Sequence, residues 1–340
     1  MEITDNIKKY ASNCNVAAIG GGTGISTMLR GIKKYFGNLT AIITVADDGG
    51  GSGMIREDLN MLPPGDVRNC IMALADTEPI MEKLLNYRFE SGRLKGQSFG
   101  NLFLAAMCGI SDGSFEKAVN KFSDVLAVKG RVLPVSEENI NLGARLSDGS
   151  VVLGESSIPS TVIHKGAKID ELFLTPAHAK PLYECIQSIY NADYIILGPG
   201  SLYTSVIPNL LVDGIAEAVE KSNAKVVYVC NIMTQPGETD GFSAFDHVDA
   251  IYKHTKRKFI DYCIVNDEPL NDFLTAKYRL THSFKVASDD YKFYKNNIKL
   301  IKKNLLDVAN NVVRHNYSVL ADTLACLFYQ TANGGNIDEI

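Results

Sequence analysis

The chain of 340 residues lacks the paired cysteines and the grouped His and Cys residues that indicate a disulfide-stabilised or zinc-binding protein. Its seven cysteines are scattered singly without a CxxC pair, and its six histidines form no HxH or HExxH motif. Isolated cysteines in apolar stretches are typical of a reducing compartment, where they act as small buried hydrophobic residues. We therefore assign no cysteine a role and predict no metal site of the zinc type.

An excess of positive charge is also absent, because 34 Lys and Arg residues face 39 Asp and Glu residues, for a net charge of -5. This balance argues against a nucleic-acid-binding protein that depends on a general basic surface. The sequence has no low-complexity tract and no block of like charges. This composition excludes disordered, collagen-like and coiled-coil classes.

No hydrophobic run suits a membrane span. The uncharged stretches 11–29 and 194–212 approach the roughly 20 residues that cross a bilayer. Glycines interrupt the first stretch, and glycines and prolines interrupt the second. We expect a soluble, cytoplasmic protein without membrane insertion.

Alternating apolar runs and helical patterns are what the sequence does contain. An apolar run over 15–19, a glycine turn, a helical pattern over 25–32 and a β-branched run over 39–46 predict a βαβ unit. The alternation returns over 194–265 with further short strands and helices, among them a strand over 194–197 and a helix over 245–254. The sequence therefore predicts an α/β fold with a Rossmann-like, doubly wound, mostly parallel sheet and helices on both faces.

The middle of the chain has a different pattern. Residues 66–126 are mostly helical in pattern, and 131–158 resembles antiparallel strands with a hairpin turn at 147–150. We predict one α/β domain over 1–340 with an inserted helical and β-hairpin subdomain over 66–160.

The strongest local signal is the glycine-rich turn at 20–24, between a strand and a helix. Glycines let the backbone approach a phosphate closely, and a helix N-terminus presents free N–H groups. The turn is not a strict GxGxxG because Ile25 occupies the third position, and no GxxxxGK[ST] motif exists, which excludes a P-loop NTPase. The alternative is a tight turn without a ligand. The candidate nucleotide-binding residues here are Gly21, Gly22, Thr23 and Gly24.

Asp47 and Asp48 follow the second strand and precede another glycine-rich stretch. One carboxylate there could hold a ribose hydroxyl or, through water, Mg²⁺, and a solvated turn is the alternative. Successive side chains of an extended chain point to opposite faces, so we expect one of the two to face a ligand. We favour Asp48, which adjoins the glycines.

Polar residues follow several other predicted elements. Asp66 is expected to cap a helix, which leaves Arg68 and Asn69 in its first turn as candidates for ligand contact. Arg314 precedes the last helix, where an anion could use the cation and the helix start together; a surface arginine is the alternative. Two loops after later strands supply the candidates Gly198, Gly200, Ser201, Asn231, Thr234 and Gln235.

The loop at 198–205 is not a nucleophile elbow, because Tyr203 stands where GxSxG requires glycine. The carboxyl ends of parallel strands share one edge of a sheet, so we expect these polar loops to converge.

Seven segments in fixed order resemble the CofD-like superfamily and, within it, the YvcK branch of gluconeogenesis factors: AIGGGTG, TVADDGGGSG, PPGDVRN, SFGNLFLAA, RVLPV, ILGPGSLYTSVIPNLLVDGI and VYVCNIMTQPGETDGF. The resemblance is close from Val16 to about His254 and looser to Phe328, and its fourth segment adds Asn101 to the candidates. The chain departs from the family pattern at Gly51, where the family has Ser, and at Gln97, where it usually has His. Glutamine cannot act as a general acid or base near neutral pH.

The resemblance implies two functions. The YvcK branch is associated with gluconeogenic growth, cell shape and envelope synthesis and is similar in binding UDP-sugars, so we predict a UDP-sugar-binding regulatory factor. The alternative is an Mg²⁺-dependent transferase of the 2-phospho-L-lactate transferase type, acting on a substrate linked to a nucleotide diphosphate. An NAD-dependent dehydrogenase fits the βαβ start but not the broken GxGxxG. No clear nucleophile or general base is present, so the binding factor is favoured. No cofactor is assigned apart from Mg²⁺ in the enzymatic alternative, and a homodimer is left open.

Overall fold

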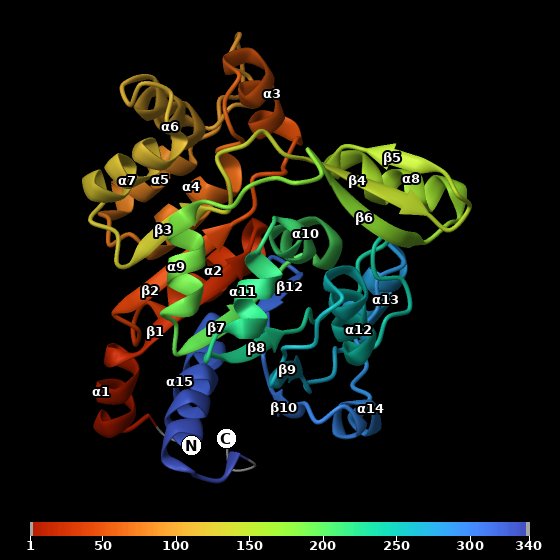
Figure 1. The fold of residues 1–340 in the computed structure, drawn as a ribbon. Coiled ribbons are helices and arrows are strands. Elements are labelled where there is room, and N and C mark those ends of the chain that lie inside the picture. The colour runs from red at the N-terminus through yellow and green to blue at the C-terminus, as the bar shows by residue number, and fades with distance from the viewer. Residues whose placement is uncertain (1–2, 338–340) are drawn as a thin grey trace.

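The computed structural model describes residues 3–337 and has a seven-stranded parallel sheet at its centre (Figure 1). The strand order is β10-β9-β8-β7-β1-β2-β3, and every neighbouring pair is parallel. The order reverses between β1 and β7, and this reversal is where ligands of open α/β sheets bind. The strands are β1 (Asn15–Gly20), β2 (Asn38–Ile43), β3 (Arg131–Pro134), β7 (Tyr194–Leu197), β8 (Lys225–Val229), β9 (Tyr262–Asn266) and β10 (Lys299–Lys303).

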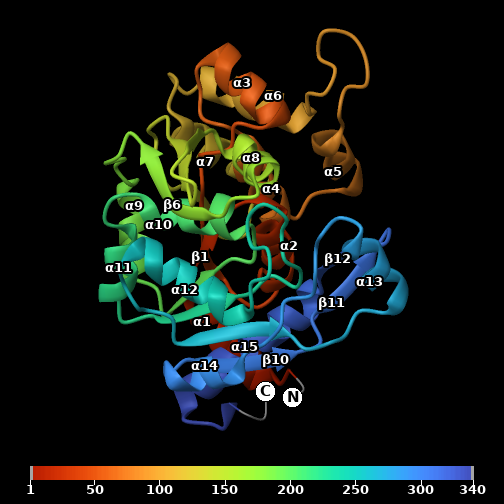
Figure 2. The ribbon, with the colours of Figure 1, turned by 90° about the vertical axis from the view of Figure 1, so that its right-hand side faces the viewer.

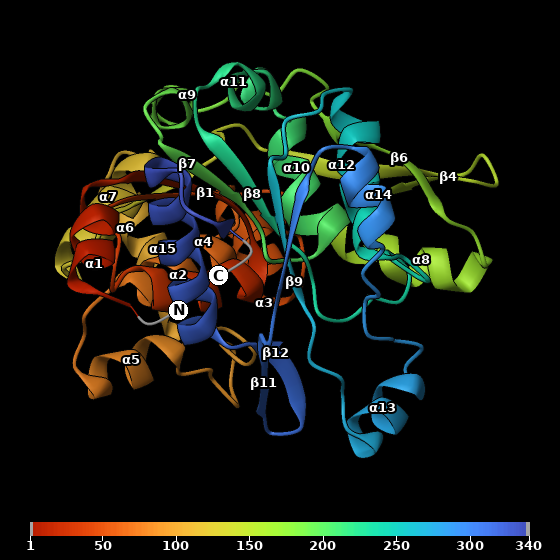
Figure 3. The ribbon, with the colours of Figure 1, turned by 90° about the horizontal axis from the view of Figure 1, so that it is seen from below.

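Helices cover both faces of this sheet, as the view from below shows (Figure 3). One face carries α1 (Asp5–Asn13), α2 (Gly22–Ile32), α4 (Gly65–Leu74) and α15 (Tyr317–Asn333), and the other carries α9 (Tyr183–Tyr190), α10 (Ile207–Leu211), α11 (Ile215–Lys221) and α12 (Ala244–Thr255). All four residues of β7 are buried, as expected for a strand covered on both sides. Phe328 of α15 stacks on Tyr194 of β7 with 3.7 Å between the ring centroids.

The crossover from β2 to β3 is almost entirely helical. It contains α3 (Gly50–Leu59), α4, α5 (Pro79–Asn86), α6 (Phe99–Gly109) and α7 (Phe115–Val125). Helix α4 packs against β2 and β3, and α7 packs against β3. Helices α3 and α6 lie beyond one end of the sheet, where Figure 2 also shows the long segment between α5 and α6 projecting.

A second, antiparallel sheet lies beside the first, with the strand order β5-β4-β6. Its elements are β4 (Asn141–Leu146), β5 (Val151–Leu153), the short turn η1 (Glu155–Ser157), α8 (Ile158–Lys165) and β6 (Ile169–Thr175). The hairpin predicted from the sequence is therefore confirmed. The doubly wound, mostly parallel fold with an additional antiparallel part is confirmed as well.

The prediction of an antiparallel strand directly after residue 131 is wrong. Residues 131–134 form β3, the edge strand of the main sheet, which pairs in parallel with β2. The short apolar run is buried against α7 and β2, and its length gives no indication of the pairing direction. The division into one domain over 1–340 with an insertion over 66–160 stays a prediction.

The remaining elements are a short helical turn, two helices and a two-stranded hairpin. After the π-helical turn η2 (Leu202–Val206) and the strands described above come α13 (Asp272–Arg279) and α14 (Asp290–Lys295), then a hairpin of β11 (Leu306–Ala309) and β12 (Val312–His315). All seven cysteines are buried and free. Among the helices described here, none has the length and apolarity needed to cross a membrane.

Candidate functional site

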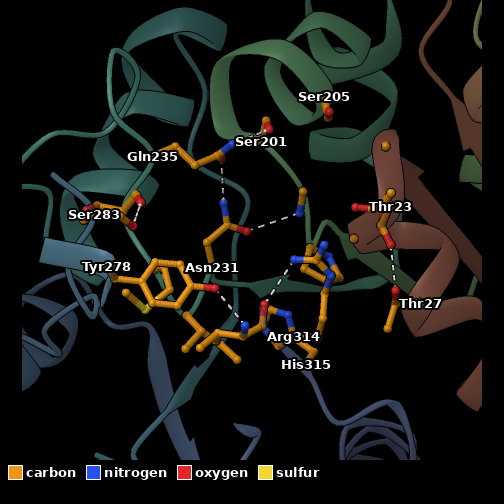
Figure 4. A pocket seen from close by; sticks show the side chains of 18 of the residues that line it. Thr23, Thr27, Ser201, Ser205, Asn231, Gln235, Tyr278, Ser283, Arg314 and His315 are labelled. Atoms are coloured by element: carbon orange, nitrogen blue, oxygen red, sulfur yellow. Dashed lines mark hydrogen bonds between the residues drawn. The ribbon is translucent and has the colours of Figure 1, made fainter. Parts of the chain in front are cut away.

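A cavity of about 380 Å³ opens at the carboxyl edge of the sheet, at the reversal between β1 and β7 (Figure 4). Loops after three strands and a wall from the C-terminal part of the chain surround it. We call it the glycine pocket. Its lining residues are Gly21, Gly22, Thr23, Gly24, Thr27, Pro199, Gly200, Ser201, Ser205, Asn231, Ile232, Met233, Thr234, Gln235, Pro236, Tyr278, Thr281, Ser283, Val313, Arg314 and His315.

The glycine turn after β1 forms one side of this pocket. Helix α2 begins at Gly22, so its N-terminal backbone faces the cavity, which is a favourable place for an anion. Gly22 has φ +68, a left-handed conformation that favours glycine. A Cβ on Gly24 would lie 2.5 Å from the carbonyl oxygen of Pro199, so Gly24 lets the turns after β1 and β7 pack backbone to backbone.

Asp66 does not cap its own helix, which corrects the expectation from the sequence. The N-cap of α4 is Pro64, and no side chain caps it. The Asp66 carboxylate instead accepts a hydrogen bond of 2.6 Å from the backbone N–H of Gly22. Burial raises the pKa of Asp66 to about 6, although the Gly22 N–H favours the charged form. Asp66 thus fixes the glycine turn from behind.

A chain of side-chain hydrogen bonds joins the loops after β7 and β8 (Figure 4). The Gly200 N–H donates to Oδ1 of Asn231, and Nδ2 of Asn231 donates to Oε1 of Gln235. Nε2 of Gln235 then donates to Oγ of Ser201 at 2.7 Å. These contacts hold amide and hydroxyl groups in place along one wall of the pocket.

The opposite wall comes from α13, the segment after it, and β12. The Val313 N–H donates to Oη of Tyr278 at 2.7 Å, which ties the hairpin to α13. The Nε2–H of His315 donates to the carbonyl oxygen of Cys230, and burial lowers the pKa of His315 to about 4, so the ring is neutral. Arg314 lies between them on the hairpin, is exposed, and bonds to the carbonyl oxygen of Val313.

The electrostatic character of the pocket follows from this lining. None of the described residues that line it is an aspartate or a glutamate, and Arg314 is their only permanently charged side chain. The α2 N-terminus adds a partial positive charge. The pocket therefore favours an anionic group.

The structure brings together many of the residues predicted from the sequence. The pocket lining includes Gly21, Gly22, Thr23, Gly24, Gly200, Ser201, Asn231, Thr234, Gln235 and Arg314. Thr234 also fastens the wall, since its Oγ1 accepts the Phe284 N–H and its carbonyl oxygen accepts the Ser283 hydroxyl. Arg314 precedes the last helix, as expected: it lies on β12, and Asn316 caps α15, which begins at Tyr317.

The other predicted residues lie outside this lining. Gly198 turns the chain behind it with φ +74. Oδ1 of Asp47 accepts the Gly49 N–H, and Oδ1 of Asp48 accepts the Ser156 N–H at 2.8 Å. The glycines after Asp48 form the first turn of α3 rather than a loop. Arg68, Asn69 and Asn101 gather on α4 and α6.

Sequence reasoning missed the wall formed by Tyr278, Thr281 and Ser283. These residues follow no predicted strand and include no glycine motif, so nothing in their pattern marks them. Ser205, whose Oγ lies 3.4 Å from the position of a Cβ on Gly22, also lines the pocket and is not among the residues predicted from the sequence.

A group of carboxylates lies beside the pocket. Burial first, and then the charge of Asp47, raises the pKa of Glu155 to about 8, while a hydrogen bond from the Thr204 hydroxyl opposes this. Burial also raises the pKa of Glu238 to about 7, and the backbone N–H groups of Tyr203 and Thr204 lower it. Within residues 3–337, however, no three His, Cys, Asp or Glu side chains are arranged to hold a metal ion. Mg²⁺ is usually held by one or two carboxylates together with waters and substrate phosphates, so Asp47 and Asp48 are the residues that would hold the ion of the enzymatic alternative.

The two departures from the family pattern meet in space. A Cβ on Gly51 would have Oε1 of Gln97 as its nearest neighbour, at 3.2 Å. A larger residue at Gly51 would press on the Gln97 side chain, so the two positions depend on each other.

Known proteins resemble this chain over most of its length. The family model of 2-phospho-L-lactate transferase CofD matches residues 16–306. A protein of Thermoanaerobacterium thermosulfurigenes is 56% identical over 315 residues, covering 93% of this chain and 97% of that protein. The protein of Bacillus subtilis (strain 168) named "Gluconeogenesis factor" is 46% identical over 313 residues, covering 92% of this chain and 97% of that protein. A crystal structure of a Bacillus halodurans protein has a TM-score of 0.88 at 47% identity, covering 91% of this chain and 99% of that one.

Proposed function

The chain belongs to the CofD-like family, among the gluconeogenesis factors, and from this premise we propose that it is a regulatory protein that binds a UDP-sugar in the glycine pocket. In this proposal it acts in the cytoplasm and supports cell shape and envelope synthesis during gluconeogenic growth. The nucleotide-sugar is its signal rather than its substrate.

One observation carries the proposal: the glycine pocket combines a helix N-terminus and one arginine with a lining free of described carboxylates. A diphosphate needs N–H donors and a cation close by, and it is repelled by acids. The Gly22 N–H is bound to Asp66, so the N–H groups of Thr23 and Gly24 and the guanidinium of Arg314 would supply these groups from two sides of the pocket. The hydroxyls and amides between them suit the ribose, the base and the sugar.

The polar network along the loops after β7 and β8 supports a nucleoside at that wall. Asn231 and Gln235 each carry an amide, which offers one acceptor and two donor hydrogens. Their mutual hydrogen bonds hold these amides in fixed orientations before a ligand arrives. Binding then loses little side-chain entropy.

The test is isothermal titration of the purified protein with UDP-N-acetylglucosamine in EDTA, with NAD as the comparison ligand. We expect saturable binding of the UDP-sugar that is tighter than the binding of NAD and is retained in EDTA. Tighter binding of NAD, or no binding of any nucleotide at saturating concentration, would contradict the proposal.

A second candidate function, transfer of a group from a nucleotide-diphosphate substrate, is favoured by one feature. Glu155 holds its proton near neutral pH, since its pKa is raised to about 8, and the family model is that of a transferase. A protonated carboxyl beside a phosphate site can act as a general acid. Consumption of UDP-N-acetylglucosamine in Mg²⁺, lost in Glu155→Gln, would favour the enzyme; intact nucleotide after long incubation favours the binding protein.

A further inference from the structure

Three helices, α3, α4 and α6, begin close together on the other side of Asp66. Ser98 caps α6, and its Oγ accepts hydrogen bonds from the Asn101 N–H and from Nη1 of Arg68 on α4, the latter at 2.5 Å. Gly51, in the first turn of α3, is the neighbour of Gln97. The helices have 10, 10 and 11 residues, for α3, α4 and α6.

Arg68 is buried there without a carboxylate partner. Only 8% of the residue is exposed, and no ion pair joins it to an acid among the residues described. Its terminal nitrogens donate to neutral oxygens, those of Ser98 and Asn69, and its Nε has no hydrogen-bond partner. A buried cation with neutral partners is costly, so a counter-anion would stabilise it.

Two further groups in this cluster are unpartnered. Oε1 of Gln97 and Oδ1 of Asn101 are buried and accept no hydrogen bond, and these residues are only 7% and 4% exposed. Buried acceptors of this kind call for a donor, such as a hydroxyl. The cluster thus lacks both an anion for Arg68 and a hydroxyl donor for the two amides.

A second cation stands at the rim. Arg88 is exposed, donates to the carbonyl oxygen of Gly96, and has an Nη1 that lies 3.6 Å from the position of a Cβ on Gly51. Burial first, and then the charge of Arg88, lowers the pKa of Arg68 to about 10, so Arg68 stays charged at neutral pH. The charge of Asp66 opposes this lowering, but Asp66 forms no ion pair with Arg68 among the residues described, and its carboxylate is bonded to the Gly22 N–H.

We propose that Arg68, Arg88, Gln97 and Asn101 form a second subsite that binds an oxyanion carrying a hydroxyl, distinct from the glycine pocket. The oxyanion pairs with the two guanidinium groups, and its hydroxyl donates to the amide oxygens. Monohydrogen phosphate and a hydroxylated sugar carboxylate share this chemistry. The proposal does not require the glycine pocket to bind a nucleotide.

The experiment is isothermal titration of the full chain at constant ionic strength, with inorganic phosphate in one arm and glucuronate in another. Each arm is run without nucleotide and again with excess UDP. Glucose, which has hydroxyls but no charge, is the negative control. We expect one of the two anions to bind and glucose not to bind, and the arm that responds identifies the anionic group.

Matched variants locate the binding. Arg68→Gln should weaken anion binding at least tenfold. Arg88→Gln should weaken anion binding severalfold, and the chain should keep its fold because Arg88 is exposed. Arg145→Gln is the control, since Arg145 is exposed on β4 beside Glu171, and it should bind as the parent chain does. Absence of binding in both arms, or unchanged affinity in Arg88→Gln, would overturn the subsite. Anion binding that UDP abolishes would overturn it too, while supporting a phosphate site in the glycine pocket.

Discussion

Arg314 is the residue on which the charge of the glycine pocket depends. It is exposed, and its one hydrogen bond described here goes to the neighbouring Val313 carbonyl oxygen, so it contributes little to folding. Arg314→Ala should reduce UDP-sugar affinity by about 1.5–3 kcal/mol, the range of a hydrogen bond to a charged group. Arg314→Lys should keep more affinity than Arg314→Ala but less than the parent, because an ammonium group cannot pair bidentately with a phosphate.

Titration calorimetry measures these losses, and thermal unfolding without ligand supplies the control. The unfolding temperature of the unliganded Arg314→Ala chain should match that of the parent. Full affinity combined with a lowered unfolding temperature would instead identify a structural arginine.

Glu155 gives a pH dependence with a definite sign. Its pKa of about 8 in the folded chain lies above the ordinary 4.5, so the folded state binds more protons than the unfolded state between these values. The free energy of unfolding that Glu155 contributes therefore falls as pH rises through this window, by at most about 1.4 kcal/mol per pH unit for one proton. Glu155→Gln should become more stable relative to the parent as pH rises from 5 to 8.

Urea unfolding of both chains at several pH values measures this difference. Subtracting the free energies of unfolding of the two chains cancels the contributions of groups that both chains share. His315 is one such group, and its lowered pKa makes its contribution to stability rise with pH. A stability difference that stays constant with pH would show that Glu155 titrates normally.

At the scale of elements, the contact between α2 and the turn after β7 depends on Gly24. A Cβ there would lie 2.5 Å from a backbone oxygen that cannot move aside. Gly24→Ala should therefore destabilise the chain by about 1–3 kcal/mol, the usual cost of an overpacked site. Gly109→Ala is the matched control, because nothing lies within 4 Å of its Cβ position at the end of α6. The control should be neutral or slightly stabilising in urea unfolding, and equal losses in the two variants would contradict the packing role of Gly24.

The C-terminal wall depends on the bond between α13 and β12. Tyr278→Phe removes the acceptor of the buried Val313 N–H and should cost about 1–3 kcal/mol locally. We expect faster amide exchange at Val313 and weaker nucleotide binding. Tyr291→Phe is the control, because Tyr291 on α14 is 75% exposed. This variant should change neither the amide exchange of Val313 nor the binding of the nucleotide. Unchanged exchange at Val313 would show that the hairpin holds without Tyr278.

Most elements could be predicted from the sequence, because strands buried on both faces are continuous apolar runs. The predicted strand at 194–197 is β7 with the same bounds, and the helix expected over 245–254 is α12. The pairing of β3 could not be predicted, because a run of four apolar residues fits either direction. The sequence predicts Asp66 as a helix cap, and this is wrong because its partner, Gly22, lies 44 residues earlier, where no local pattern indicates it.

At the scale of the whole molecule, sheet topology explains why the site could be predicted in part. Parallel strands bring their following loops to one edge, so the loops after β1, β7 and β8 were expected to meet there. The wall formed by α13 and β12 does not belong to the alternating strands and helices of the main sheet. No local sequence pattern indicates that these elements lie over the pocket. Figure 2 shows α13 and the β11–β12 hairpin on the side of α2.

The most direct test of the central claim is a crystal structure grown with UDP-N-acetylglucosamine in EDTA. The account predicts the intact nucleotide-sugar in the glycine pocket, with its diphosphate against the backbone of Gly22–Gly24 and within hydrogen-bond distance of Arg314. A nucleotide bound elsewhere, or a diphosphate in the pocket with no contact to this turn or to Arg314, would contradict it.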